Sequence, residues 1–421
     1  IVFTGRVDVG TSEQVQIECV ASTMAAPGGG GGGGGSGEQA APAPRIGTAT
    51  RIRSAQRTSA LAWSPLAAHA QYLVTGTAAG TLDLSFNTSG VVELYALDFT
   101  DGDVHSTTFE PVASAPTASK FQSLAWGTTG VKDGKFSHGI VAGGLDDGTI
   151  CFFNPKSLLD GGVAADDGSS SSGGSGDVVV ASAQHHQGGV QDLDFNAFDA
   201  RFVASGGADG KVFIYDLSDA AAPKVYTPGA ATSTLADVTC VRWNCKVQHI
   251  LATTVRSGTT VIWDLKAKKS VVSFSDKTKH THCRAMAWHP LNATQLVTAS
   301  EDDAEPVIQL WDLRNSTAPV RYLQSHKAGI SALSWSHVDP SLLLSVAKDG
   351  HSLVWDVNSG DVLCELDGKQ REGYNFTAAW SPLLPAVAAT CSVDAELAVH
   401  AVQDPSARRA ATTVHSDLGT L

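Results

Sequence analysis

Short apolar segments that close with an aromatic residue recur along the chain from about residue 45 onward. Examples are ALAWSP at 60–65, AMAWHP at 285–290 and ALSWSH at 332–337. The aromatic positions are Trp63, Trp126, Phe195, Trp243, Trp288, Trp335 and Trp380, and the last four intervals between them are 48, 45, 47 and 45 residues. The first two intervals, 63 and 69 residues, contain inserts, one of them the Ser/Gly-rich stretch at 166–177. Alternating apolar and polar positions over such short runs predict β-strands.

Further strands follow each of these segments. They end in an aromatic residue and a polar residue, as in VFIYD at 212–216, VIWD at 261–264 and LVWD at 353–356. Between the two halves lie small residues and a tight turn, such as SGGADGK at 205–211. An Asp-Gly pair between two apolar runs indicates a hairpin, because glycine adopts the positive φ that the turn needs. Each unit is therefore predicted to be a meander of short antiparallel strands.

The period of about 45 residues is that of the WD repeat, in which one repeat forms one four-stranded propeller blade. Seven units predict an all-β, seven-bladed WD-repeat β-propeller over residues 45–403. The last unit supplies three strands, so TATRIRSAQR at 48–57 is predicted to add the outer strand of the seventh blade and close the ring.

The two ends of the chain are expected to lie outside this propeller. Residues 1–44 contain a long glycine tract and are predicted to be a disordered, low-complexity segment. The first methionine is Met24, so the interpretation that part of this segment is untranslated stays open. Residues 404–421 are predicted to be a C-terminal tail that starts the connection to downstream regions.

Two units carry the polar set that is typical of this repeat class. The sets are His326, Ser345, Asp349 and Trp355 in the sixth unit, and His186, Ser205, Asp209 and Tyr215 in the third. We expect a hydrogen-bond relay from the indole or phenol through the hydroxyl and imidazole to the turn carboxylate, which satisfies buried polar groups. A hydrolase triad is the alternative for Ser, His and Asp. The structural role is preferred because the set recurs at the repeat spacing and no nucleophile elbow is present.

The acidic stretch SEDDAEP at 300–306, which contains Glu301, Asp302 and Asp303, is the most conspicuous charged motif. Aligned on the following Trp-Asp pair, it occupies the turn that AKDG fills in the next unit. It is predicted to be a lengthened hairpin turn, because a calcium loop needs carboxylates at a different spacing. HTHC at 280–283 lacks a second ligand pair at zinc-finger spacing. No metal, cofactor or catalytic site is predicted, and the chain is not expected to be an enzyme.

Composition narrows the function classes. The formal net charge is −13, which provides no basic footprint for nucleic acid or for an anionic lipid surface. No apolar run approaches the roughly 20 residues of a membrane helix. Seven cysteines, an odd number without a CxxC pair, indicate reduced thiols in a cytosolic protein.

Longer stretches carry a more specific resemblance than the repeat consensus. They are YLVTGTAAGTLDLSFNTSGVVELYALDF at 72–99, CRAMAWHPLNATQLVTASEDDAEPVIQLWDLR at 283–314 and HKAGISALSWSHVDPSLLLSVAKDG at 326–350. Through these stretches the chain resembles, over about residues 48–402, the N-terminal propeller of the large outer-shell subunit of the COPII vesicle coat. The acidic turn is among the most distinctive stretches of the resemblance.

The resemblance implies a structural scaffold of the COPII outer coat in transport from the endoplasmic reticulum to the Golgi. It implies a cytoplasmic protein, peripheral on endoplasmic reticulum exit sites and COPII vesicles. Other outer-coat propellers at cage vertices are the implied direct partners. The smaller six-bladed WD-repeat coat subunit, the inner coat and its small GTPase are implied partners of family regions that this sequence does not include. Stable binding of the smaller subunit and stimulation of GTP hydrolysis are therefore not expected of this chain.

Two other functions stay open at this point. WDLR at 311–314 fits the W-D-x-R pattern of WD-repeat substrate adaptors of cullin-type ubiquitin ligases. That motif is short, and Arg314 is expected to form an ion pair at the blade edge. A propeller enzyme would need a metal or a titratable cluster along the central channel.

Overall fold

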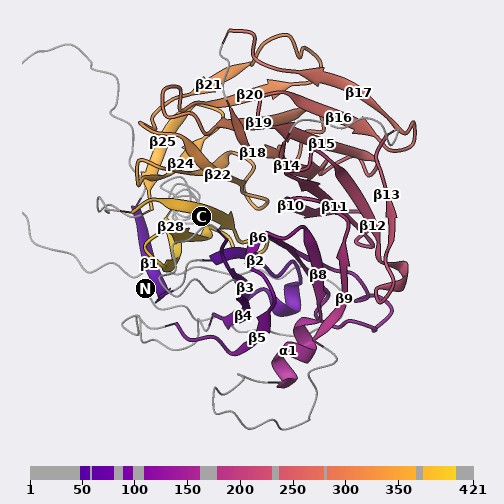
Figure 1. Cartoon of the computed structure of the whole chain (residues 1–421). Coiled ribbons are helices and arrows are strands. Elements are labelled where there is room, and N and C mark those ends of the chain that lie inside the picture. The colour runs from indigo at the N-terminus through magenta and orange to yellow at the C-terminus, as the bar shows by residue number, and fades with distance from the viewer. Residues whose placement is uncertain are drawn as a thin grey trace, which may run out of the picture.

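Seven four-stranded antiparallel sheets surround a common axis (Figure 1). The computed structural model describes residues 48–56, 59–79, 89–97, 109–161, 178–229, 237–278, 282–366 and 373–403. The predicted all-β, seven-bladed propeller is confirmed within them. The low-complexity segment predicted at 1–44, the insert predicted at 166–177 and the tail predicted at 404–421 lie outside the described residues.

The first six blades are consecutive meanders. From the axis outward, blade one consists of β2 (Ser59–Trp63), β3 (Tyr72–Thr77), β4 (Gly90–Ala96) and β5 (Ala113–Thr117), and blade two of β6 (Phe121–Gly127), β7 (Ile140–Leu145), β8 (Thr149–Phe153) and β9 (Val179–Gln184). In the same order, blade three consists of β10 (Val190–Phe195), β11 (Phe202–Gly207), β12 (Val212–Asp216) and β13 (Lys224–Tyr226), and blade four of β14 (Val238–Trp243), β15 (Ile250–Val255), β16 (Thr260–Asp264) and β17 (Lys269–Phe274). Blade five consists of β18 (Cys283–Trp288), β19 (Gln295–Ser300), β20 (Ile308–Asp312) and β21 (Arg321–Leu323), and blade six of β22 (Ile330–Trp335), β23 (Leu342–Ala347), β24 (Ser352–Asp356) and β25 (Asp361–Glu365).

Blade seven is assembled from both ends of the described chain. Strands β26 (Asn375–Trp380), β27 (Val387–Ser392) and β28 (Glu396–Gln403) are joined by β1 (Thr48–Gln56), which pairs antiparallel with β28 from Thr48↔Gln403 to Gln56↔Glu396. Figure 1 shows the indigo β1 beside the yellow β28. This pairing closes the ring, because the outer strand of the last blade comes from a segment that precedes the first blade.

The hydrophobic core is distributed between neighbouring blades. One cluster joins Ile308 and Leu310 of blade five to Leu343 and Trp355 of blade six, and equivalent clusters fill the other blade interfaces. The second strand of each blade is almost entirely buried, as in β23 and β27, because both of its faces contact a neighbouring sheet. Strands buried on both faces are continuous apolar or small-residue runs, which is the pattern of LLLSVA and VAATCS.

The few helical segments are short. They are the 3₁₀ turns η1 (Ala67–His69) and η2 (Leu217–Asp219) and the helix α1 (Pro155–Gly161). Among the residues with described positions, none forms a helix that is long and apolar enough to cross a membrane.

Candidate functional site

The aromatic residues that define the repeat close the innermost strand of each blade, as their spacing predicts. Three indole N–H groups cross to the preceding blade and donate to a carbonyl oxygen there: Trp63 to Ala379 (3.0 Å), Trp243 to Asp194 (3.1 Å) and Trp288 to Arg242 (3.1 Å). Trp126 and Trp335 instead donate within their own blades, to His138 and Pro340 (both 2.8 Å). Phe195 has no donor and packs against Gly127, where an added Cβ would lie 2.2 Å from its ring.

The polar set of blade six forms a continuous relay. The indole of Trp355 donates to the hydroxyl of Ser345 (2.8 Å), which lies 2.7 Å from His326 Nε2. His326 Nδ1 lies 3.1 Å from the carboxylate of Asp349, which also accepts the N–H groups of Lys327 and His351. Burial alone would raise the pKa of Asp349, but these hydrogen bonds lower it to about 2. The polar atoms of the relay therefore form hydrogen bonds to one another and to the backbone of the blade, as expected for a structural role.

The corresponding set of blade three is less complete. His186 Nδ1 lies 2.9 Å from Asp209 and Nε2 lies 2.8 Å from Ser205. The hydroxyl of Tyr215 interacts with the hydroxyl of Ser205, and it also lies 3.5 Å from Nδ1 of the neighbouring His185, at the outer limit of a hydrogen bond. Burial lowers the pKa of His186 against the opposing effect of Asp209, so the imidazole is neutral at physiological pH.

In blades four and five, other residues replace members of this relay, and sequence analysis did not identify them. Their buried indoles, Trp263 and Trp311, donate to the hydroxyls of Thr253 (3.0 Å) and Thr298 (3.1 Å). In blade five, Asp276 takes the place of the turn carboxylate. It accepts hydrogen bonds from Gln309 (3.0 Å) and Tyr322 (2.8 Å). The sequence does contain a threonine at the serine position of each of these two blades. Because the histidine of the relay is missing there, the threonine was not recognised as its member.

The acidic turn is a clasp between three blades. Glu301 forms an ion pair with Arg256 of blade four. Asp303 accepts the N–H of Gly329 in blade six (2.8 Å) and lies 3.6 Å from the ammonium group of Lys348. The carboxylate of Asp302 accepts the N–H of Ala304 within the turn itself (3.0 Å). Each of the three carboxylates thus has a partner within the chain, and the described residues contain no group of three His, Cys, Asp or Glu that could hold a metal ion.

Gly329 tests the clasp, because a Cβ at this position would lie 1.9 Å from the carbonyl oxygen of Glu301. We expect Gly329→Ala to force the acidic turn away from blade six and to destabilise the propeller by about 1 to 3 kcal/mol. Chemical denaturation followed by tryptophan fluorescence measures this. Gly161→Ala is the matched control, since no atom lies within 4 Å of its added Cβ. Equal stability of the two variants would show that the turn is not held against blade six.

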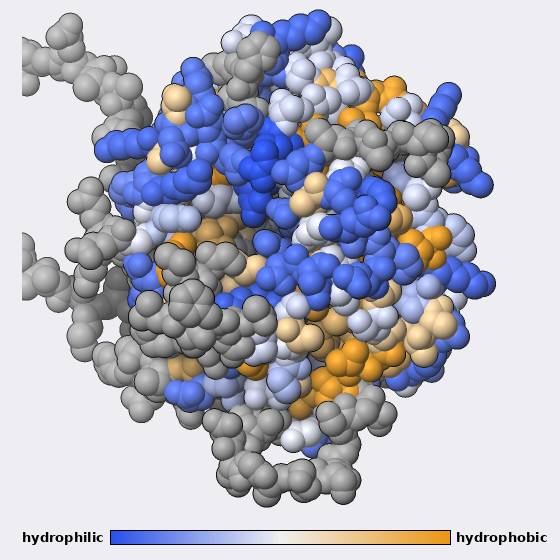
Figure 2. Space-filling view, viewed as in Figure 1, coloured by the Kyte–Doolittle hydropathy of each residue, from blue (hydrophilic) through white to orange (hydrophobic). Residues whose placement is uncertain are grey.

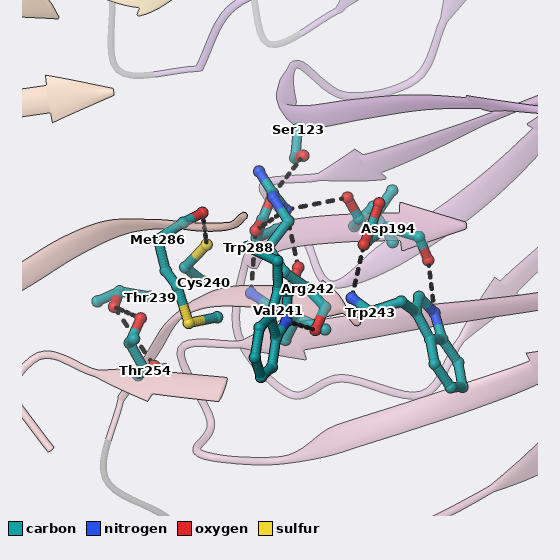
Figure 3. Close-up of polar contacts among 12 residues, drawn as sticks. Ser123, Asp194, Thr239, Cys240, Val241, Arg242, Trp243, Thr254, Met286 and Trp288 are labelled. Atoms are coloured by element: carbon teal, nitrogen blue, oxygen red, sulfur yellow. Dashed lines mark hydrogen bonds and ion pairs between the residues drawn. The ribbon is translucent and has the colours of Figure 1, made fainter. Parts of the chain in front are cut away.

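A charged cluster on the innermost strands was missed by sequence analysis (Figure 3). Asp192 of β10 forms an ion pair with Arg242 of β14, accepts the N–H of Val241 (2.9 Å) and accepts the hydroxyl of Ser123 (3.2 Å). Asp194 accepts the N–H of Trp243 (2.7 Å). The inner edge of β14 has no neighbouring strand, so these carboxylates satisfy N–H groups that a sheet would otherwise leave unpaired.

The sequence indicates this charged cluster only through the positions that its residues occupy in the repeat. The three charged residues occupy first-strand positions where the other units carry Ala, Ser, Thr or Cys. The carboxylates are committed to Arg242 and to backbone groups, which makes the cluster structural rather than catalytic.

Asp194 makes the stability of the folded propeller depend on pH. Burial raises its pKa to about 7, although Arg242 acts in the opposite direction. A carboxyl group with a raised folded-state pKa costs stability as the pH rises from its unfolded value toward 7. Asp194→Asn can still accept the Trp243 N–H and removes this cost. We therefore expect the melting temperature of the variant, relative to that of the unmodified chain, to increase between pH 5 and pH 8. A difference that is constant across this range would contradict the assignment.

Arg314 of the W-D-x-R motif is held locally. Its guanidinium donates to Asp312 of the same turn, with Nε 3.0 Å from Oδ1. The pKa of Asp312 is lowered, chiefly by the hydrogen bond from Arg314. The expected blade-edge ion pair is present, and it accounts for the motif without a ligase partner.

Comparison with known proteins gives this propeller its family. The WD domain, G-beta repeat model matches residues 178–216 and 317–356. The protein transport protein SEC31 of Dictyostelium discoideum is 36% identical over 377 residues, which are 84% of this chain. Sec31A of Gallus gallus is 37% identical and that of Homo sapiens 36% identical, each over 85% of this chain. The propeller belongs to the Sec31 family.

The Sec31-family alignment covers the propeller and a limited part of each relative. The chain spans 27% of the length of the Dictyostelium discoideum and Gallus gallus proteins and 28% of the Homo sapiens protein. Among solved structures, a chain of "COPII on membranes, outer coat vertex" matches with a TM-score of 0.64 and 29% identity, over 83% of this chain and 84% of that chain. A chain of "The structure of the COPII coat assembled on membranes" matches with the same TM-score and identity, over 47% of its length. The relatives are transport and coat proteins, so the ligase-adaptor alternative is not favoured.

Proposed function

We propose that this Sec31-family propeller is a structural scaffold of a COPII-type outer coat and acts in vesicle transport from the endoplasmic reticulum to the Golgi. The observation that carries the proposal is the match to an outer-coat vertex chain at 29% identity, over more than four fifths of both chains.

The scaffold role agrees with the chemistry of the described residues. Their conspicuous polar groups stabilise the propeller. The relays act within blades, the acidic clasp acts between blades, and the charged cluster joins the inner strands. The proposed role is therefore non-enzymatic, and it needs a rigid shape rather than a reactive group. Figure 2 shows a predominantly hydrophilic face with hydrophobic residues gathered in small patches, as expected for weak contacts that act through many copies.

Direct contacts are proposed with other outer-coat propellers at cage vertices, on a coat that is peripheral to endoplasmic reticulum exit sites. The smaller six-bladed coat subunit, the inner coat and the small GTPase are proposed as partners of other regions of the family. They would reach this propeller only through the assembled coat.

A domain exchange tests the proposed function. This propeller would replace the aligned segment of Homo sapiens Sec31A in cells depleted of their own Sec31A. The expected result is recruitment of the chimera to exit sites and restored secretion of a reporter cargo. The controls are Sec31A without any propeller and Sec31A with an unrelated seven-bladed propeller. A chimera that restores secretion no better than these two controls would count against the proposal.

A further inference from the structure

The loops that join the first and second strands of each blade share one face of the ring, which we call the loop face. In blade three, Asn196 Oδ1 accepts the N–H groups of Phe198 (2.9 Å) and Asp199 (3.1 Å), while its amide donates to the carbonyl of Gln248 in blade four (2.8 Å). These contacts fix the loop internally and tie it to the next blade.

The same device recurs in the next two blades. Asn244 accepts the N–H groups of Lys246 (2.8 Å) and Val247 (2.9 Å), and it donates to Ala293 of blade five (2.8 Å). In blade five, Nδ1 of His289 accepts the N–H groups of Leu291 and Asn292, both at 3.0 Å. The loops of blades three to five are therefore rigid, and the side chains at their tips are held in fixed positions.

The tips carry large apolar side chains that face solvent. Three residues after the anchor aromatic stand Phe198, Lys246, Leu291 and Val338 in blades three to six, which together we call the tip arc. Phe198 is 50% exposed, Leu291 61% and Val338 47%. One exposed apolar residue needs no explanation. Three of the four residues at this position in consecutive loops are apolar and form an arc, and rigid exposed apolar groups are typical of binding surfaces.

Unpaired lysines lie beside the tip arc. Lys246 belongs to it, Lys266 and Lys268 lie in the turn between β16 and β17 of the same blade, and Lys269 begins β17. The two segments are adjacent, because the N–H of Leu265 donates to the carbonyl of His249 (3.0 Å). All four lysines are exposed, and none of their ammonium groups forms an ion pair with another part of the chain that the structure describes. In a chain of net charge −13, these four lysines form a local concentration of positive charge, in which the carboxylate of Asp264 lies near Lys266.

We propose that the loop face across blades three to six binds an acidic segment of a protein partner whose apolar side chains rest on the tip arc. The lysines select carboxylates and steer the encounter, while the apolar tips provide the contact area that is removed from water. This site is independent of the proposed coat role, since it would exist in any protein that carries this propeller.

An anionic membrane is the competing occupant of a basic and apolar surface. The net charge of the chain disfavours it, because a bilayer extends past the lysines and also meets the acidic remainder of the molecule. A short acidic segment reaches only the charges within a Debye length of about 8 to 10 Å, where lysine predominates.

Fluorescence anisotropy with the purified chain tests the proposal. The probe is a short labelled peptide of acidic residues interspersed with Leu and Phe. The reference peptides replace either every acidic residue by its amide or every apolar residue by Ser. The acidic, apolar probe is expected to bind at least about tenfold more tightly than both references, with an affinity that falls as salt increases. Equal affinity for the three peptides, or no binding of the probe, would overturn the proposal.

Variants locate the site. Lys266→Glu with Lys268→Glu is expected to weaken probe binding about tenfold, and Phe198→Ser with Leu291→Ser by a similar factor. Lys277→Glu with Lys327→Glu is the matched control, since both of these lysines are exposed in the segments that precede β18 and β22, at the opposite end of the first strands from the loop face. An unchanged melting temperature shows that each variant is folded. Equal losses in the control and the test variants would reject the site, and so would preferential binding of phosphatidylserine vesicles over the probe.

Discussion

Removal of residues 45–57 is expected to lower the melting temperature of the propeller by about 5 to 10 °C. The deletion takes away β1, which pairs with β28 along its whole length, and the ion pair between Arg51 and Glu396. It also exposes the edge of a strand whose Leu397 and Val399 are fully buried. A net contribution of about 0.5 to 1.5 kcal/mol per hydrogen bond gives a loss on the order of 5 kcal/mol.

Thermal unfolding followed by circular dichroism measures the effect of this deletion. Deletion of residues 1–44 is the matched control, because β1 begins at Thr48 and remains in that variant. A synthetic peptide of residues 45–57, added in excess, should restore part of the lost stability to the shortened chain. A melting temperature unchanged by the longer deletion, or insensitive to the peptide, would mean that β1 does not hold the ring closed.

The closing strand also shows which parts of the fold a sequence can predict. Seven anchor aromatics, the last five of them at a nearly constant interval, indicate the number of blades, and the missing fourth strand of the last unit requires a replacement. Both inferences depend on periodicity, which one chain displays many times. The same alignment assigns the acidic turn to a hairpin from its position in the repeat, and residues 301–307 lie between β19 and β20.

Contacts between blades could not be predicted in this way. The partner of Glu301 is Arg256, and the partner of Asp303 is the N–H of Gly329. Neither pairing repeats in the other blades, so the period contains no information about it. Similarly, Asp192 and Arg242 meet because adjacent innermost strands approach each other at the axis. Their pairing follows from geometry in three dimensions, and the sequence shows only that both are unusual for their repeat position.

Substitution of Arg242 by Met is expected to destabilise the propeller by about 2 to 3 kcal/mol. Met keeps much of the apolar stem of the side chain but leaves the carboxylate of Asp192 without its cation. The Asp192 side chain is only 9% exposed, so water compensates little of this loss. The expected value lies below the range of about 3 to 5 kcal/mol for fully buried pairs, because the Arg242 side chain is 32% exposed.

Double-mutant analysis of this ion pair separates lost charge pairing from lost packing. Asp192→Asn with Arg242→Met removes both charges and retains an oxygen that can accept the Val241 N–H, so we expect this variant to recover more than half of the stability lost in Arg242→Met alone. Urea denaturation of the four proteins in the cycle gives the coupling free energy. The single variant should also recover stability on acidification from pH 8 to pH 5, since the pKa of Asp194, which burial raises and Arg242 lowers, rises further when Arg242 is removed. If the double variant is as unstable as Arg242→Met at every pH, the guanidinium acts through packing, and the inner strands do not depend on its charge.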